Sequence, residues 1–503
     1  MLIAKAYKTF GRDITSIRVL DALGLFLILY LSCISLNRFD TSYDTLAYHL
    51  PYAGLRSGII KPAQFVLPAG LAERYRGFPP VVDLVQGGLW KLFGRPEAAE
   101  LIATISVLIF GIYLRITYKL SIFWTVCLFL AVPILHTALN SAMTDLWTNT
   151  FFALHLFAAV QPGRSKKDGL VHTAISCIAL AIAVNSKEQF YIVGALSYSL
   201  ILLEKAFHAF RTNPSVAGKA SAFNEILVFV FAFPVIFYSP LRDLILFGNP
   251  IYPIGLKILG HKLPGAEINS GWWGPNSLAH APQPVRYFLS QLDLEATNLR
   301  PDGYTIGQGD QPGPAGQPGD RMGGSLAVLL ISAITCLIVG LMKIRSSART
   351  PLIAGFLVLV TFIAFFPGSN ELRYFSFIEI TIIVSALYIL TISARQGDQS
   401  ADTFLFCLKC LLLYSAIYVG ALNGFSHFMW PKHAHVKNVI SEFGARGQIS
   451  EITKNSRVVC YARGDQLALL YAPVLNANKI KKEYQFVVAR NASECPTSAA
   501  IIQ

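Results

Sequence analysis

The chain has 503 residues, of which 53% are hydrophobic and only 14% are charged. Because a soluble domain typically carries about 25% charged residues, this composition excludes a soluble enzyme, and the 34 Phe, 21 Tyr and 6 Trp residues exclude a disordered chain. The net charge of +13 does not call for a nucleic-acid partner, since the cytoplasmic loops of membrane proteins collect Lys and Arg.

Long apolar runs predict an all-α polytopic membrane protein. A spanning helix needs about 20 mostly apolar residues, and the chain offers about eleven such runs. These runs are 19–37, 97–116, 120–139, 145–160, 169–185, 190–204, 223–246, 324–342, 351–367, 374–393 and 403–421.

The distribution of positive charge predicts the orientation. With the N-terminus in the cytoplasm, basic clusters such as Arg164–Lys167 and Lys343–Arg349 fall inside, whereas the turn 140–144 has no Lys or Arg. The apolar run 79–94 would reverse this order if it were a span. We therefore interpret it as a helix that lies along the outer membrane surface.

Three regions then face away from the cytoplasm. We expect residues 1–421 to form the membrane domain, with outer loops 38–96 and 247–323, and residues 422–503 to form a small extracytoplasmic α/β domain with strands near 457–462 and 484–489. Gly and Pro residues in 301–323 predict a loop without regular structure.

Cysteine positions leave one question open for the terminal domain. Its two cysteines, Cys460 and Cys495, either form a disulfide, as the extracytoplasmic location permits, or remain as unpaired buried thiols. His433 and His435 resemble a metal-binding pair, but without further ligands nearby we predict no protein metal site.

Acidic residues gather beside the first and third spans. Asp40 and Asp44 would share one face if their segment were helical, and Asp145 begins the fourth span. Each carboxylate could simply cap a helix. Alternatively, two carboxylates on the same side of the membrane suit general-base chemistry, with one positioning or tuning the other.

Cations at the outer ends of spans break the charge rule. Lys187 and Arg373 are the clearest cases, and Arg74 precedes the surface helix. They could bind a lipid phosphate, since Arg does so with two hydrogen bonds and Lys as a point charge. The alternatives are ion pairs with Glu188 or Glu371, or contact with lipid headgroups.

The segment from Asp44 through Tyr48 and His49 to Pro51 resembles the opening motif of GT-C fold glycosyltransferases. The resemblance is to the branch that includes bacterial protein mannosyltransferase-like and lipid A aminoarabinose transferase-like enzymes. Residues 144–146, 247–253 and 371–374 are also similar to this branch, and the likeness covers roughly 20–395.

The resemblance implies an inverting enzyme of the bacterial inner membrane. Such enzymes move a sugar from a polyprenyl-phosphate carrier to a lipid, glycan or protein acceptor outside the cytoplasm. By resemblance, Asp44 is the catalytic base and Asp145 supports it. The residues expected to contact substrate or phosphate are Asp40, Tyr48, His49, Arg74, Lys187, Glu188, Asn249, Glu371 and Arg373. The usual acidic pair beside the base is absent unless Asp40 substitutes, so the need for a divalent cation stays open.

Three other functions would share parts of this pattern. A lipid-linked glycan ligase or polymerase has the same topology and phosphate chemistry. A transporter or flippase would place charged residues near the bilayer midplane and show internal repeats, which the sequence does not show. A non-catalytic assembly subunit would use the terminal domain for docking.

Overall fold

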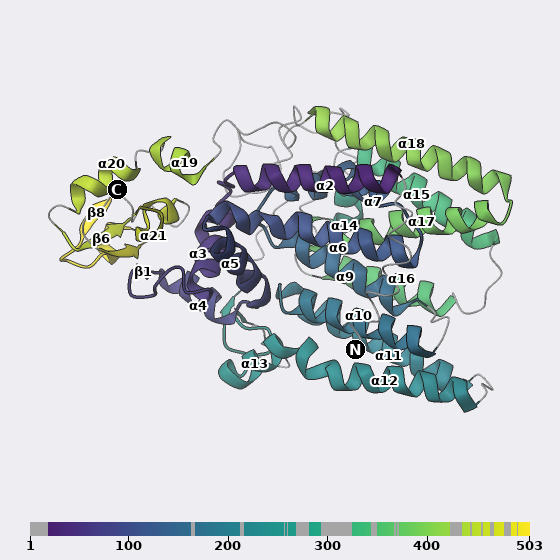
Figure 1. Cartoon of the computed structure of the whole chain (residues 1–503). Helices are drawn as coiled ribbons and strands as arrows, with labels where there is room; N and C mark the ends of the chain where they lie inside the picture. Colours follow the sequence, from purple (N-terminus) through teal and green to yellow (C-terminus); the bar gives the residue numbers. More distant parts are fainter. Residues whose placement is uncertain are drawn as a thin grey trace.

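The computed structural model describes a bundle of long helices with a small sheet at one end (Figure 1). The residues that it describes are 19–161, 166–211, 216–255, 257–258, 260–267, 281–292, 324–343, 350–366, 369, 372–422, 435–442, 445–453, 456–462, 467–476, 484–489 and 491–502. The predicted loop 301–323 lies outside these residues, as does His433.

The bundle in Figure 1 is built from long helices, and their apolar composition explains why they pack into one large core. They are α2 (Val19–Asn37), α6 (Leu101–Thr117), α7 (Ile122–Ala131), α9 (Asp145–Ala159), α10 (Lys166–Val184), α11 (Gln189–Arg211), α12 (Val216–Ile236), α15 (Gly324–Lys343), α16 (Thr350–Phe365), α17 (Phe377–Arg395) and α18 (Gln399–Leu422).

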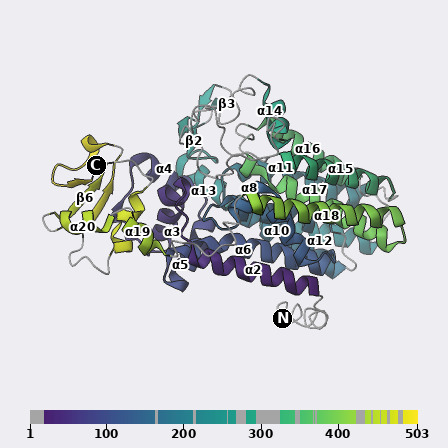
Figure 2. The same ribbon diagram turned by 90° about the horizontal axis from the view of Figure 1, so that it is seen from above.

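Shorter helices lie between these helices or follow the last of them. They are η2 (Thr45–His49), α3 (Leu50–Arg56), α4 (Ala69–Gly77), α5 (Val81–Phe93), η3 (Pro96–Glu100), α8 (Pro133–Ala138), α13 (Tyr238–Phe247), α14 (Gln283–Leu292), η6 (Leu372–Phe375), α19 (Val436–Glu442), α20 (Ala445–Ile452), η7 (Ala468–Tyr471), α21 (Pro473–Asn476) and η8 (Ala492–Glu494). Figure 2 shows α3, α4 and α5 gathered at the end of the bundle that faces the terminal strands.

The chain is a multi-span membrane protein, but fewer helices meet the length of a span than the sequence predicts. Among the described residues, five helices are long and apolar enough to cross a membrane, or six if the bent pair α12–α13 counts as one span. Four further apolar stretches, within α7, α10, α15 and α16, have only 10–17 residues. The expected number of eleven is therefore not confirmed.

Two predicted spans are interrupted. The run 120–139 divides into α7 and α8 at Pro133, because proline lacks the amide hydrogen that a continuous helix needs. The run 223–246 bends by 47° between α12 and α13. The predicted surface segment 79–94 forms the 13-residue helix α5, with its Gly94 C-cap at a φ of 68°.

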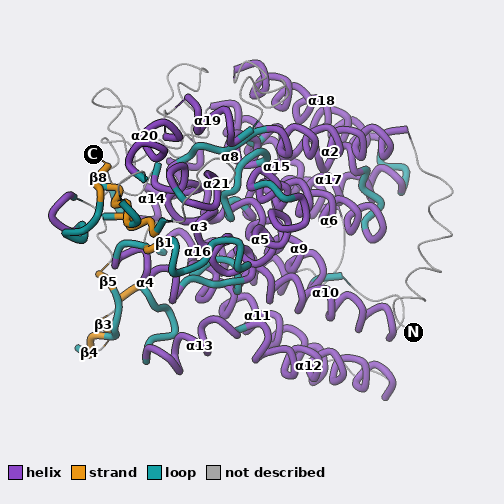
Figure 3. The backbone as a smooth tube through the Cα atoms, turned by 60° about the vertical axis from the view of Figure 1, so that its left-hand side comes forward, coloured by secondary structure: helices purple, strands orange, loops and turns teal. Residues whose placement is uncertain are grey.

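The terminal segment, which comprises the described residues between 435 and 502, contributes three strands to a parallel sheet. The sequence predicts two of them. Strands β6 (Val458–Tyr461) and β7 (Gln485–Val488) lie where strands are predicted, and β8 (Ala500–Ile502) flanks β6. The fourth strand, β1 (Phe65–Val66), comes from the first outer loop and pairs with β7, with Phe65 opposite Phe486. Figure 3 shows these strands together at one end of the molecule.

Four shorter strands form two small ribbons after α13. Strand β2 (Ile254–Gly255) pairs with β5 (Ala266–Glu267), and β3 (Lys257–Ile258) pairs with β4 (His261–Lys262).

A second hydrophobic core joins the first outer loop to the terminal segment. Leu46 and Leu50 belong to the same buried cluster as Leu469, Leu470 and Phe486. The division expected at residue 422 therefore does not correspond to a division between separate cores.

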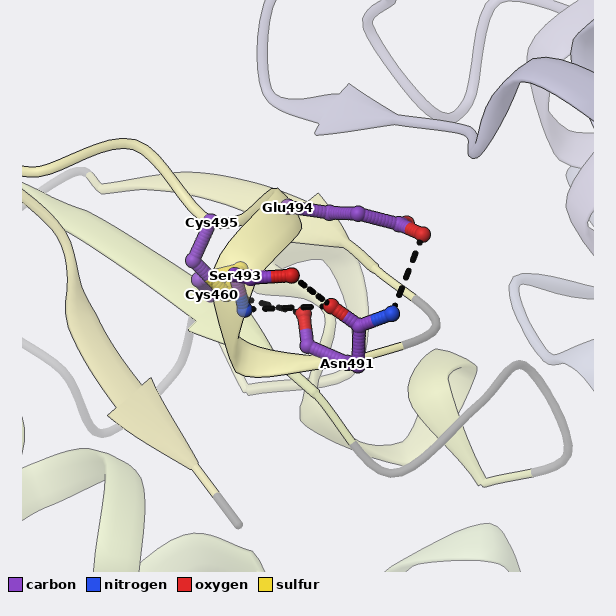
Figure 4. Close-up of a disulfide and its surroundings, with 5 residues drawn as sticks. All are labelled: Cys460, Asn491, Ser493, Glu494 and Cys495. Atoms are coloured by element: carbon purple, nitrogen blue, oxygen red, sulfur yellow. Dashed lines mark hydrogen bonds between the residues drawn. A yellow bond between two sulfur atoms is a disulfide. The ribbon is translucent and has the colours of Figure 1, made fainter.

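Cys460 and Cys495 form a disulfide with a Cα–Cα distance of 5.8 Å (Figure 4). Of the two alternatives for these cysteines, the structure therefore has the disulfide and not the pair of free thiols. Beside the bond, the Asn491 side chain accepts hydrogen bonds from the Ser493 amide at 3.1 Å and from its hydroxyl at 2.5 Å, which holds the turn η8. The disulfide thus links the central strand β6 to the segment that leads into β8.

Candidate active site

The acidic motif after α2 begins a π-helix. Asp44 precedes η2, and the Leu50 amide donates a hydrogen bond to the Thr45 carbonyl, five residues back. In this wide turn the Tyr48 hydroxyl forms a hydrogen bond with the Asp44 carboxylate. His49 lies close enough to influence the pKa of that carboxylate. Such turns are rare and often occur at functional sites.

Arg373 approaches Asp44 from the far end of the sequence. Its Nη1 donates a hydrogen bond to Asp44 Oδ2 at 2.8 Å, across 329 residues. The side chains are only 15% and 13% exposed, respectively, so water screens this pair weakly.

Asp145 and Lys187 form a second ion pair close by. Asp145 is the first residue of α9, and its carboxylate accepts from Lys187 Nζ, while Thr144 caps the helix without its side chain. The Lys187 and Asp145 side chains are 11% and 6% exposed, respectively. Asp145 therefore does not serve as a side-chain cap, which was one of its two expected roles.

Tyr374 joins the two ion pairs. Its ring centre lies 4.3 Å from Lys187 Nζ and 5.4 Å from the Arg373 guanidinium carbon, both within the range of cation–π attraction. Asp145 and Arg373 also line one small cavity, together with Met143, whose sulfur lies 3.7 Å from Arg373 Nη1. The structure thus brings Asp44, Asp145, Lys187 and Arg373 together.

Electrostatics set the charge of the two central groups. Burial by itself would raise the pKa of Asp44, but the charge of Arg373, helped by His49 and Tyr48, outweighs it and lowers that pKa below its usual value. Burial lowers the pKa of His49 to about 4. At neutral pH, Asp44 is therefore a carboxylate and His49 an uncharged imidazole.

Asp40 is engaged by the protein rather than free for a ligand. Its segment is not helical, so it does not share a helix face with Asp44. Asp40 Oδ2 accepts from the Thr45 and Ser141 hydroxyls at 2.5 and 2.8 Å and from the Ala142 amide at 3.2 Å. The carboxylate ties the first outer loop to the turn 140–144, so we assign it a positioning role.

The remaining predicted residues lie at the edge of this group or apart from it. Glu188 feels the charges of Lys187 and of the exposed Arg74, although burial is the larger influence and raises its pKa. Asn249 is buried and donates to the Ile254 and Pro264 carbonyls at 2.7 and 2.6 Å, so it organises its own loop. Glu371 lies outside the described residues.

Asn149 is a residue of the candidate site that sequence reasoning missed. Its Nδ2 donates to the Asp145 and Arg373 carbonyls at 2.8 and 2.9 Å, and its Oδ1 accepts from the Phe377 amide at 3.0 Å. One buried amide thus fixes both halves of the site. The available signal was a polar residue one helical turn after Asp145 within an apolar run.

The arrangement supplies acid–base and anion-binding groups. Two carboxylates, two cations and a neutral imidazole meet at the end of the bundle where α2 finishes and α9 begins. Within the part of the chain that the structure describes, no three His, Cys, Asp or Glu side chains form a group that could hold a metal ion.

Comparison with known proteins identifies the fold. No protein-family model and no curated protein sequence matches the chain. Among solved structures, ArnT from Cupriavidus metallidurans bound to undecaprenyl phosphate aligns over 90% of this chain and 84% of its own, with 13% sequence identity and a TM-score of 0.51. The chain has the ArnT fold. The resemblance to GT-C fold enzymes drawn from the motifs is thereby confirmed at the level of the fold.

Two other structures align over similar lengths. ArnT in its apo state gives a TM-score of 0.50 at 13% identity, covering 90% of this chain and 84% of that chain. The oligosaccharyltransferase AglB from Archaeoglobus fulgidus, in complex with an inhibitory peptide and a dolichol-phosphate, gives 0.42 at 12% identity, covering 91% of this chain and 65% of that chain.

Proposed function

We propose that this chain is a membrane glycosyltransferase that takes a sugar from a polyprenyl-phosphate carrier and transfers it, with inversion, to an acceptor hydroxyl. The observation that supports this most is the meeting of Asp44–Arg373 with Asp145–Lys187 around Tyr374. The ArnT structure with the same fold was obtained with undecaprenyl phosphate, the lipid left when such a donor gives up its sugar.

The proposed reaction uses Asp44 as the base and the two cations as partners of the phosphate. The acceptor oxygen attacks the anomeric carbon while the bond from that carbon to the phosphate oxygen breaks. Asp44 takes the acceptor proton, a contribution typical of general bases at about 10²–10⁴-fold. The bonding electron pair leaves on the phosphate, where Arg373 and Lys187 stabilise the developing negative charge.

Donor binding would also activate the base. In the free protein Arg373 holds the Asp44 carboxylate. A phosphate that draws Arg373 toward itself removes the influence that lowers the pKa of Asp44, so the carboxylate becomes a stronger base when the substrate is in place.

The location follows the charge distribution. We place the site on the non-cytoplasmic face of a bacterial inner membrane, with the N-terminus in the cytoplasm, because the basic clusters lie in loops at the opposite ends of the spans. The sugar and the class of acceptor are left to experiment.

The test is transfer from undecaprenyl-phosphate sugars by purified protein with Asp44→Asn. We expect the variant to lose about 10²-fold or more in kcat while keeping its fold. Unchanged transfer would reject Asp44 as the base. Glu73→Gln, which changes an exposed acid on α4, is the matched control and should keep wild-type activity.

Product analysis separates the rival functions. A transferase of this kind leaves polyprenyl monophosphate, whereas a lipid-linked glycan ligase or polymerase leaves the diphosphate. A flippase moves the donor and leaves it intact.

A further inference from the structure

The terminal segment contacts the very turn that follows Asp44. The 3-10 turn η7 packs against the π-helix η2. Leu469 and Leu470 are fully buried in the same core as Leu46 and Leu50, which lie within and directly after the π-helix. Both η7 and the π-helix η2 therefore contribute apolar side chains to this contact, which covers η2 from water.

Turn η7 is itself held firmly. Tyr484 Oη donates to the Tyr471 carbonyl at 2.7 Å, and Asn476 Nδ2 donates to the Leu470 carbonyl at 2.9 Å. The rings of Tyr461 and Tyr471 lie 5.0 Å apart, which fixes the turn against strand β6. A turn secured in this way can act as a rigid support.

Two further contacts tie the terminal segment to the part of the chain between α2 and α6. Strand β1 pairs with β7, and the stacked rings of Phe65 and Phe486 lie 5.7 Å apart. Elsewhere, buried Glu97 accepts a hydrogen bond from the Val436 amide at 2.8 Å. The terminal segment that carries η7 is thus anchored at two further places.

We propose that η7 is a positioning element for Asp44, acting through Leu470 on the π-helix. This inference rests on the proposed function for its effect on sugar transfer, but not for its effect on the helix. A single π-turn gains little from its own hydrogen bonds, so the apolar contact with η7 holds Tyr48 and His49 in place around Asp44.

The experiment uses full-length protein with Leu470→Ala, and Leu46→Ala from the other side of the contact. Hydrogen exchange of the amides of residues 46–50 reports the helix directly. We expect exchange there to accelerate at least ~10-fold and kcat for sugar transfer to fall more than KM rises. Leu470→Met, which keeps the side-chain volume, should restore both quantities.

Leu412→Ala is the matched control, since it removes a fully buried leucine from α18, which belongs to the other hydrophobic core. It should leave exchange at 46–50 and kcat per folded molecule unchanged. Unaltered exchange at 46–50 in both leucine variants would overturn the proposal. Faster exchange in a protein whose wild type transfers no sugar would reject the proposed function but support the positioning of the helix by η7.

Discussion

Arg373 is the main partner of the candidate base, Asp44. It reaches Asp44 at 2.8 Å and also contacts the ring of Tyr374. Because the carboxylate is mostly buried, the guanidinium is the largest of the influences that lower the pKa of Asp44. An arginine that can turn toward a phosphate would couple donor binding to base strength.

Replacing Arg373 by Gln should therefore change the pH dependence of transfer. Asp44 acts as a carboxylate, so activity is present above its pKa and is lost as the pH falls through it. Without the guanidinium this pKa rises, and the acid limb of the kcat/KM profile should move upward by roughly 1–3 pH units. Arg76→Gln on α4 is the control, and an unmoved limb in Arg373→Gln would contradict the coupling.

The wild-type profile supplies a second check at this scale. The kcat/KM profile reports the free protein, in which Arg373 holds Asp44, and the kcat profile reports the complex, in which the phosphate competes for Arg373. The acid limb of kcat should therefore lie at higher pH than that of kcat/KM. Coincident limbs would mean that donor binding leaves the Asp44–Arg373 pair intact.

Helix α9 organises the site at the scale of elements. Asp145, Trp147 and Asn149 project from its first two turns toward Lys187, Ser186 and Arg373, respectively. Each contact uses a polar group that would be costly to bury alone. The helix start thus fixes two loops that are distant in sequence.

A buried ion pair links two of the short helices around the site. Arg56 Nε donates to Asp83 at 2.9 Å, linking α3 to α5, and burial raises the pKa of Asp83 to about 6 despite this partner. Arg56→Met should lower the free energy of unfolding by about 3–5 kcal/mol, because it leaves a buried carboxylate without a counter-charge.

The loss of stability in Arg56→Met should be smaller at low pH. The folded pKa of Asp83 lies above its unfolded value, so the folded state gains stability as the pH falls through about 6. The midpoint of thermal unfolding of Arg56→Met should therefore recover at pH 5 relative to pH 8. The double variant with Asp83→Leu should recover at both values, and equal midpoints for wild type and Arg56→Met at pH 8 would contradict the argument.

Charge alternation could place Asp44, Asp145, Lys187 and Arg373 on one side of the membrane, but it could not pair them. Sequence neighbours such as Glu188 favour local ion pairs, whereas the observed partners are 42 and 329 residues apart. Such pairings depend on helix packing, which no local pattern encodes.

Strand β1 shows the same limit at the scale of elements. Its two residues, Phe65 and Val66, are too few for a period-2 pattern, and only the sheet of the terminal segment makes them a strand. Asp40 could not be assigned either, because the donors that occupy it come from residues 141–142 of another loop.

At the scale of the whole molecule, the two ends of the bundle should lie on opposite sides of the membrane. Single cysteines at Arg76 and Gln396, placed in a background with Ser at Cys33, Cys407 and Cys410, test this in intact cells. A membrane-impermeant maleimide should label Arg76→Cys and spare Gln396→Cys until the membrane is opened. The reverse pattern would invert the proposed orientation.

The most direct measurement of the central claim is mass spectrometry of the lipids that co-purify with wild-type protein and with Asp44→Asn. The mass of a bound donor identifies its sugar class directly, so no particular sugar has to be supplied. We expect polyprenyl monophosphate on the wild type and an intact polyprenyl-phosphate sugar accumulating on the variant, because the donor binds but the acceptor proton is not removed. The absence of any polyprenyl-phosphate species from both proteins would contradict the account.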